Sequence, residues 1–140
     1  MTGRIILVES DVVLGAVLKE VLVHSGYEVN IVRTLKDEVG NIHSASAVIL
    51  DIDTTSAEKE LAWLDSHQPY GESLPIVVLG LQVPQELNHG LRADIGRQQT
   101  NVLTAVQKPF RNGELLEALR QVQESSLPGQ TTETISRRAL

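Results

Sequence analysis

The sequence predicts an α/β fold with helices on both faces of a parallel sheet, because two patterns recur along it. Apolar runs of strand length alternate with stretches in which apolar residues recur at helical spacing. Charged residues come soon after three of these runs: Glu9 and Asp11 after residues 5–8, Asp51 after residues 48–50, and Lys108 after residues 102–106. The carboxyl ends of parallel strands meet at one edge of a sheet, where such folds place their binding sites. We therefore expect three acids and one lysine to lie close together.

The composition indicates a single acidic globular domain. At 140 residues the chain has the length of one domain, and with 3% aromatic residues its core must consist of aliphatic side chains. The absence of cysteine excludes disulfides and thiol catalysis, and no apolar run approaches the roughly 20 residues that span a bilayer. A net charge of −6 argues against a sequence-independent nucleic-acid interface, which requires a basic surface. We expect a cytoplasmic protein that contacts neither nucleic acid nor membrane directly.

The first half of the chain contains three predicted strands and two predicted helices. The strands are residues 5–8, 28–33 and 47–51, of which the last is the most apolar and is expected at the centre of the sheet. Helical spacing predicts a helix that follows Asp11 and ends at Gly26, with a core face formed by Leu14, Val17, Leu18 and Val21. Residues 35–42 have a weaker helical pattern.

The second half continues the alternation. A helix is expected from Ser56 to just before Pro69, with Leu61 and Leu64 facing inward. The remaining elements are a strand at 76–79, a helix from Pro84 toward Arg92, a strand at 102–106, and a helix at 111–124 that buries Leu115, Leu119 and Val122. Five strands alternating with five helices predict a three-layer (βα)5 sandwich, for which the flavodoxin-like strand order 2-1-3-4-5 is common.

The helical and strand patterns stop near residue 124. The segment that follows includes Ser-Ser-Leu-Pro-Gly-Gln-Thr-Thr, whose composition is typical of linkers. We therefore expect one domain over residues 1–124 and a flexible tail or linker over residues 125–140.

Four short pieces of the sequence carry a resemblance to a known family. They are Ile-Leu-Val-Glu-Ser-Asp at 6–11, Val-Ile-Leu-Asp at 48–51, Leu-Pro-Ile-Val-Val-Leu at 74–79 and Lys-Pro-Phe at 108–110. In this order and at this spacing, over about residues 4–122, they resemble the receiver domain of bacterial response regulators. The chain is also similar to the receiver domains of flagellar enhancer-binding transcription regulators.

The resemblance implies roles for the residues at the expected site. Asp51 stands at the position of the phosphoacceptor, and Lys108 at that of the lysine that steadies the phosphoryl oxygens. Glu9 and Asp51 would be the metal ligands for Mg²⁺, with Glu9 and Asp11 in an acidic pocket. The family has a cis peptide bond before the residue that corresponds to Pro109. Receiver domains pair through a surface that corresponds to residues 85–124 here, which implies a homodimer, and their partners are a histidine kinase and an output domain.

Three positions depart from the family pattern. Ser10 replaces the second acid, Gly80 replaces the hydroxyl residue after the fourth strand, and Ala105 replaces the aromatic residue before the lysine. A neutral Ser10 removes a carboxylate that Mg²⁺ would use, so we expect weak Mg²⁺ binding or no cofactor. The sequence thus predicts a degenerate receiver, a non-enzymatic regulatory module with impaired phosphorylation that acts through protein–protein interaction or dimerisation. The alternative is a working receiver that a histidine kinase phosphorylates on Asp51.

An enzyme is a third hypothesis. Residues 51–55, Asp-Ile-Asp-Thr-Thr, also resemble the opening motif of haloacid-dehalogenase-type phosphatases, whose first aspartate attacks phosphorus. That motif normally follows the first strand, whereas here it follows the third, and no later acidic pair completes its metal site.

Structural roles compete with the functional ones at two positions. Asp51 and Lys108 can equally form an ion pair that serves stability alone. Asp11 directly precedes a helical pattern, which favours a role as helix N-cap over a role as metal ligand.

Overall fold

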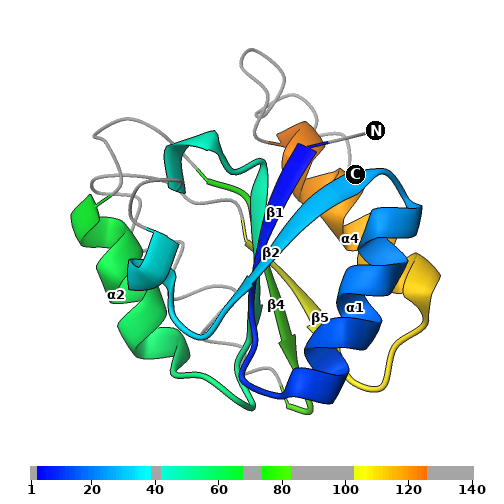
Figure 1. The fold of residues 1–140 in the computed structure, drawn as a ribbon, viewed down its shortest axis with the longest axis horizontal. Coiled ribbons are helices and arrows are strands. Elements are labelled where there is room, and N and C mark those ends of the chain that lie inside the picture. Colours follow the sequence, from blue (N-terminus) through cyan, green and yellow to red (C-terminus); the bar gives the residue numbers. More distant parts are fainter. Residues whose placement is uncertain (1–2, 39–41, 68–73, 83–102, 126–140) are drawn as a thin grey trace, which may run out of the picture.

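The central feature of the computed structural model, which describes residues 3–38, 42–67, 74–82 and 103–125, is a parallel sheet (Figure 1). Its strands lie in the order β2-β1-β3-β4-β5, which confirms the predicted flavodoxin-like topology. The strands are β1 Gly3–Val8, β2 Tyr27–Val32, β3 Ala47–Asp51, β4 Ile76–Gly80 and β5 Leu103–Gln107. All five residues of β3 are buried, which places the most apolar predicted strand at the centre of the sheet.

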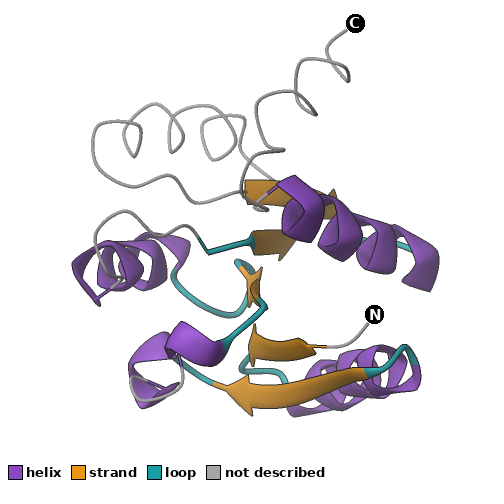
Figure 2. Cartoon of the chain, turned by 90° about the horizontal axis from the view of Figure 1, so that it is seen from above, coloured by secondary structure: helices purple, strands orange, loops and turns teal. Residues whose placement is uncertain are grey.

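Helices cover both faces of the sheet and make three layers (Figure 2). One face carries α1 (Val12–His24) and α4 (Asn112–Ser125), and the other carries α2 (Ala57–His67) and two short 3₁₀ helices. Successive side chains of a strand point to opposite faces, so Ile5 and Leu7 join one core cluster while Ile6 and Val8 join the other. The first cluster includes Leu18, Leu22, Leu115, Leu119 and Val122 from the helices, and the second includes Leu61 and Leu64.

The helix α1 presents a different core face from the one that the sequence predicts. Leu18 is buried as expected and Leu14 and Val21 are half-buried, but Val17 is 54% exposed, and Leu22, which the spacing does not assign to the core face, is fully buried. Valines and leucines occur on several sides of this helix, so the spacing alone does not select the side that packs on the sheet. The buried residues of the helix are Gly15, Leu18 and Leu22, and a Cβ at Gly15 would be in ordinary van der Waals contact with Glu9 and Ile31 at 3.5 Å.

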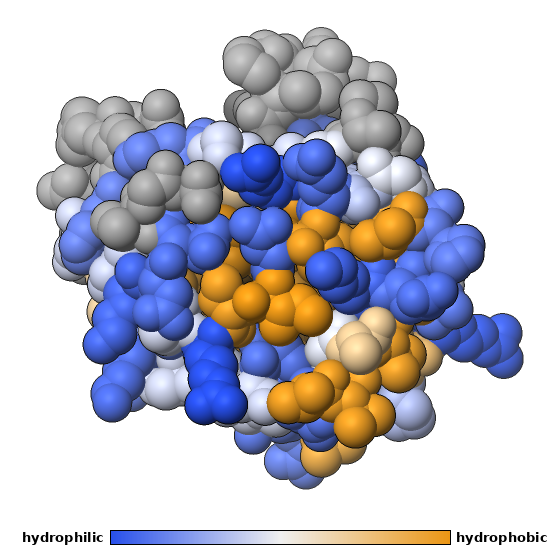
Figure 3. Space-filling model, viewed as in Figure 1, coloured by the Kyte–Doolittle hydropathy of each residue, from blue (hydrophilic) through white to orange (hydrophobic). Residues whose placement is uncertain are grey.

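Exposed valines gather on the solvent side of α1. They are Val12, Val13, Val17 and Val23, and in Figure 3 the apolar atoms at the lower right lie over the first turns of this helix. At the far end of the helix Gly26 has a φ of 99°, a conformation that glycine adopts without strain, and the chain turns there into β2 as predicted.

The prediction of a single helix over residues 35–42 is wrong. The structure has 3₁₀ helices at Leu35–Glu38 and Ile42–Ser44, and the apolar residues Leu35 and Ile42 that begin them are buried. A carboxylate from α2 explains the first of these turns. Glu60 is only 7% exposed and accepts hydrogen bonds from the Leu35 N–H at 2.8 Å and the Thr34 hydroxyl at 2.9 Å. These bonds satisfy donors at the start of the turn, so a short 3₁₀ helix forms there.

Several predictions from the sequence lie outside the described residues. These are the helix from Pro84 toward Arg92, the tail over residues 126–140, and the first part of the expected dimer surface at residues 85–124. Within the described ranges, no helix is long and apolar enough to cross a membrane.

Substitution of Glu60 tests its role in holding the first 3₁₀ turn against α2. We expect Glu60→Ala to lower the free energy of unfolding by about 1–3 kcal/mol, because it leaves the buried Leu35 N–H without its acceptor. Urea denaturation measures the change. Glu58→Ala in the same helix turn is the control, since Glu58 is exposed, and an equal loss in both variants would contradict the assignment.

Candidate functional site

The carboxyl edge of the sheet brings Asp51 and Lys108 together, although 57 positions separate them along the chain. Asp51 ends β3 and its side chain is 0% exposed, whereas Lys108 follows β5 and its side chain is 15% exposed. The Lys108 ammonium donates to Oδ2 of Asp51 at 2.8 Å. Such a buried carboxylate requires a partner of opposite charge, and the lysine supplies it.

Asp53 is a second carboxylate on the same lysine, and the sequence predicts no place for it in a receiver-like site. Its Oδ2 lies 3.1 Å from the Lys108 Nζ and accepts a hydrogen bond from the Leu81 N–H at 2.9 Å. The Asp53 N–H in turn donates to Oδ1 of Asp51 at 2.9 Å. Both carboxylate oxygens of Asp51 are therefore engaged, one by Lys108 and the other by Asp53.

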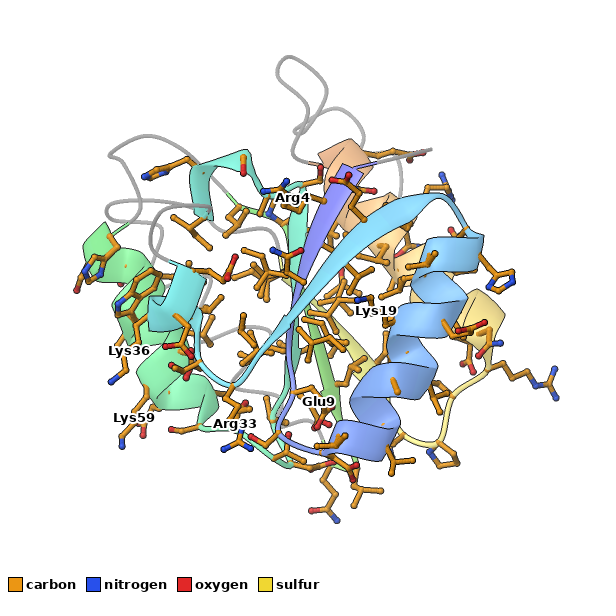
Figure 4. The ribbon with its side chains drawn as sticks, in the orientation of Figure 1. Arg4, Glu9, Lys19, Arg33, Lys36 and Lys59 are labelled. Carbon is orange, nitrogen blue, oxygen red and sulfur yellow. The ribbon has the colours of Figure 1, made fainter. Side chains whose placement is uncertain are left out.

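Glu9 lies at the end of β1 beside this network, at the opposite end of the strand from Arg4 (Figure 4). It is 3% exposed, and its Oε2 accepts from the Thr54 hydroxyl at 2.8 Å and the Asp11 N–H at 3.0 Å. Its other oxygen, Oε1, is buried and has no hydrogen-bond partner among the residues that the structure describes. The sequence gives no signal for Thr54 beyond its nearness to Asp51.

Burial and neighbouring groups shift the pKa values of all three central residues. Burial, together with the nearby Asp51, raises the pKa of Glu9 to about 7. Burial alone would raise the pKa of Asp51, but a proton on the neighbouring Glu9, the Lys108 ammonium and the Asp53 N–H all favour the charged carboxylate and lower that pKa. Burial opposes the charge of Lys108, yet hydrogen bonds to Asp51 and Asp53 raise its pKa. A protonated Glu9 can donate to Asp51, which fits a pair of neighbouring carboxyls that share one proton.

The three positions that depart from the receiver pattern have different surroundings. Ser10 is exposed, and its backbone N–H lies 3.4 Å from the Thr54 hydroxyl oxygen. Ala105 is half-buried on β5. At Gly80, Ile52 fills the space that a side chain would need, because a Cβ there would lie 2.7 Å from Cγ1 of Ile52. The sequence shows that position 80 lacks a hydroxyl, but it does not show that the side chain of Ile52 fills the space.

Two further site predictions concern Asp11 and Pro109. Asp11 is the N-cap of α1, and its Oδ1 accepts from the Leu14 N–H at 3.0 Å. The carboxylate of Asp11 thus caps the helix terminus, and its backbone N–H donates a hydrogen bond to Glu9. The peptide bond between Lys108 and Pro109 is cis, in agreement with the family resemblance.

The arrangement does not match a resident Mg²⁺ site. Within the described ranges, no three histidine, cysteine, aspartate or glutamate side chains are placed to hold a metal ion together. Both oxygens of Asp51 already have partners, and the position beside Glu9 is the neutral Ser10. Oε1 of Glu9 is buried without a hydrogen-bond partner, but this carboxyl holds its proton up to about pH 7 because its pKa is raised, and Mg²⁺ typically needs one or two carboxylates together with waters and substrate phosphate.

Comparison with known proteins identifies the fold. No family model and no curated protein matches the chain. Among solved structures, NtrX from Brucella abortus in complex with ADP superposes with a TM-score of 0.68 at 19% identity and covers 99% of this chain. This chain spans only 29% of the length of NtrX.

Single-domain structures match over most of their own length. The signal receiver domain of a protein described as a LuxO repressor, from Vibrio parahaemolyticus, has a TM-score of 0.65 at 18% identity, with 90% of this chain and 93% of that one covered. A response regulator receiver protein from Sinorhizobium medicae has a TM-score of 0.67 at 17% identity, with 90% and 98% covered. The chain therefore has the fold of response-regulator receiver domains.

The contact between Gly80 and Ile52 can be tested by a double-mutant cycle. We expect Gly80→Ala to cost about 1–3 kcal/mol of stability, because the new methyl group overlaps the isoleucine side chain. In an Ile52→Ala background the same change should be milder by about 1 kcal/mol, because the overlapping atoms are gone. Denaturant unfolding of the four proteins gives the coupling. Gly113→Ala, where a Cβ meets nothing within 4 Å, is the control and should not destabilise.

The pH dependence of stability tests the environment of Glu9. Its pKa is about 7 in the folded chain against a reference value of 4.5, so the folded state holds the proton more tightly. The free energy of unfolding contributed by Glu9 is therefore greatest below about pH 4.5 and declines as pH rises to about 7. Thermal unfolding from pH 4.5 to pH 8 should show this decline in the wild type but not in Glu9→Gln. Parallel curves for the two proteins would contradict the shift, and Glu58→Gln serves as the exposed control.

Proposed function

We propose that this chain is a signal-transduction regulatory module, a receiver domain in which Mg²⁺-dependent phosphorylation of Asp51 is impaired and which acts through protein–protein interaction. The observation that carries the proposal is the engagement of Asp51. Lys108 holds one oxygen of its buried carboxylate and the Asp53 N–H holds the other. Each oxygen keeps a second lone pair, so these contacts restrain the orientation of the carboxylate toward an incoming phosphorus and thereby disfavour transfer.

The lack of a complete metal site supports the same proposal. Phosphoryl transfer depends on positioning and on neutralising the charge that spreads over the phosphoryl oxygens, for which enzymes generally use metal ions. Ser10 supplies no carboxylate here, and Gly80 supplies no hydroxyl. These substitutions favour a domain that keeps the sheet and the ion pair but does not catalyse its own phosphorylation. We accordingly propose that the chain is not an enzyme.

Its partners are proposed from the neighbours and from the surface. The structural neighbours are described as a signal receiver domain, a response regulator receiver protein and NtrX, and this chain spans only part of NtrX. We infer an output domain or a histidine kinase as partner, in the cytoplasm. A groove between β5 and α4, lined by residues that include Thr104, Gln107, Glu114 and Gln121, lies within the region 85–124 through which we propose that the chain forms a homodimer.

The alternative is a working receiver, which two observations support. The buried pair of Asp51 and Lys108 is intact, and Oε1 of Glu9 remains a hard oxygen without a hydrogen bond. If the pocket rearranged on meeting Mg²⁺, these groups could still support transfer to Asp51. The two hypotheses make opposite predictions for a small phosphodonor.

Phosphodonor treatment followed by intact mass measurement decides between them. We expect the unmodified chain to gain no phosphoryl group in the presence of Mg²⁺, since the metal site is short of a carboxylate. Ser10→Asp should bind Mg²⁺ more tightly, by roughly tenfold or more, because it adds a hard anionic oxygen beside Glu9. Calorimetric titration with Mg²⁺ measures the affinity of both proteins.

The control for this experiment is Asp51→Asn, which cannot accept a phosphoryl group on this side chain. Ready phosphorylation of the unmodified chain, lost in Asp51→Asn, would overturn the proposal in favour of the working receiver. Equal and weak Mg²⁺ binding with or without Ser10→Asp would show that more than this one position limits the metal site.

A further inference from the structure

The carboxylate of Asp53 joins three segments that are far apart in the sequence. It belongs to the turn after β3, it accepts from the Leu81 N–H after β4, and it pairs with Lys108 after β5. Its own N–H donates to Asp51, so the residue contacts the site through both its backbone and its side chain. Among the residues that the structure describes, Asp53 is the carboxylate that contacts all three of these loops.

The donors around Asp53 are those of an anion site. An ammonium group at 3.1 Å and a backbone N–H at 2.9 Å converge on Oδ2, and both prefer a negatively charged oxygen. Only 27% of the Asp53 side chain is exposed, so the pair is partly shielded from water and the attraction is stronger than at an open surface. The Asp53 carboxylate already occupies the donors Lys108 and Leu81 N–H, so an external anion would have to displace it to bind them.

The net charge of Asp51, Asp53 and Lys108 also disfavours the binding of an external anion. Asp51 and Asp53 place two negative charges on the single positive charge of Lys108, so the group as a whole is negative. A phosphoryl-type dianion that approaches it is repelled, and removal of the Asp53 carboxylate would lower this negative charge by one. The repulsion is largest where the charges lie within a few ångströms in a partly buried site.

We propose that Asp53 is a built-in anion that occupies the phosphoryl-binding position formed by Lys108 and the Leu81 N–H, and thereby blocks external anions while fixing the loops after β3 and β4. The inference deepens the proposed function, on which it rests, because it names the group that keeps the site from accepting a phosphoryl group. Ile52 and Gly80 fit this view: the side chain next to Asp53 fills the space above the residue that precedes Leu81.

Titration with inorganic phosphate, without Mg²⁺ and without any phosphodonor, tests the inference. We expect no saturable change in the NMR signals of the Leu81 N–H or the Lys108 ammonium in the wild type. In Asp53→Ala the same signals should shift with saturation, at an affinity at least roughly tenfold higher, because one negative charge and one competing acceptor are gone. Adding Lys108→Ala to that variant should abolish the response.

Two further variants of the chain serve as controls. Asp53→Asn retains the size and an acceptor oxygen but not the charge, so it should bind phosphate with an affinity between those of the wild type and Asp53→Ala. Asp65→Ala removes an exposed aspartate from α2 and should behave as the wild type. If Asp53→Ala lost its fold in the NMR spectrum, Asp53→Asn alone would carry the test.

Other outcomes would overturn the inference. Equal phosphate affinity in the wild type and in both Asp53 variants would show that Asp53 does not compete for the site. Binding in Asp53→Ala that survives Lys108→Ala would place the phosphate elsewhere. Because no phosphoryl transfer is involved, either result leaves the proposed function to be judged by the mass measurement.

Discussion

The ammonium of Lys108, shared by two carboxylates, is the interaction on which the carboxyl edge of the sheet depends. Asp51 is fully buried and would be costly to ionise without it, and Asp53 would have no cation to hold its turn in place. Glu9 responds to the same charges, since the ionised Asp51 beside it helps to keep its proton on at neutral pH. One lysine thus stabilises the charge of Asp51 and joins the turn after β3 to the loop after β5.

The order of the strands and the helices α1, α2 and α4 could be predicted, because each of these elements leaves a local pattern. The central position of residues 47–51 followed from their unbroken apolar run, and the strand order followed from the number and alternation of elements. The meeting of Asp51 with Lys108 was predictable for the same reason: it depends only on where parallel strands end. The buried face of α1 was not predictable in the same way, because valines and leucines occur on several sides of this helix and the spacing does not select between them.

The details of the site could not be predicted from the sequence because they depend on loop conformation. Whether Asp53 points to solvent or to Lys108 is decided by the turn after β3 and by the position of the Leu81 N–H, neither of which has a periodic pattern. The burial of Glu60 is a similar case. An acid in the first turn of a helix usually stays in water near the helix terminus, but here it meets the N–H of a neighbouring turn.

The separation of the site residues along the chain has a consequence for folding. The ion pair of Asp51 and Lys108 joins positions 57 residues apart, and the bond from Thr54 to Glu9 joins positions 45 apart. Closing such long loops costs conformational entropy before any contact repays it, which slows folding of parallel sheets. No local segment can assemble this edge alone, so the network forms only when β1, β3 and β5 are all in place, and its presence reports that these three strands have assembled.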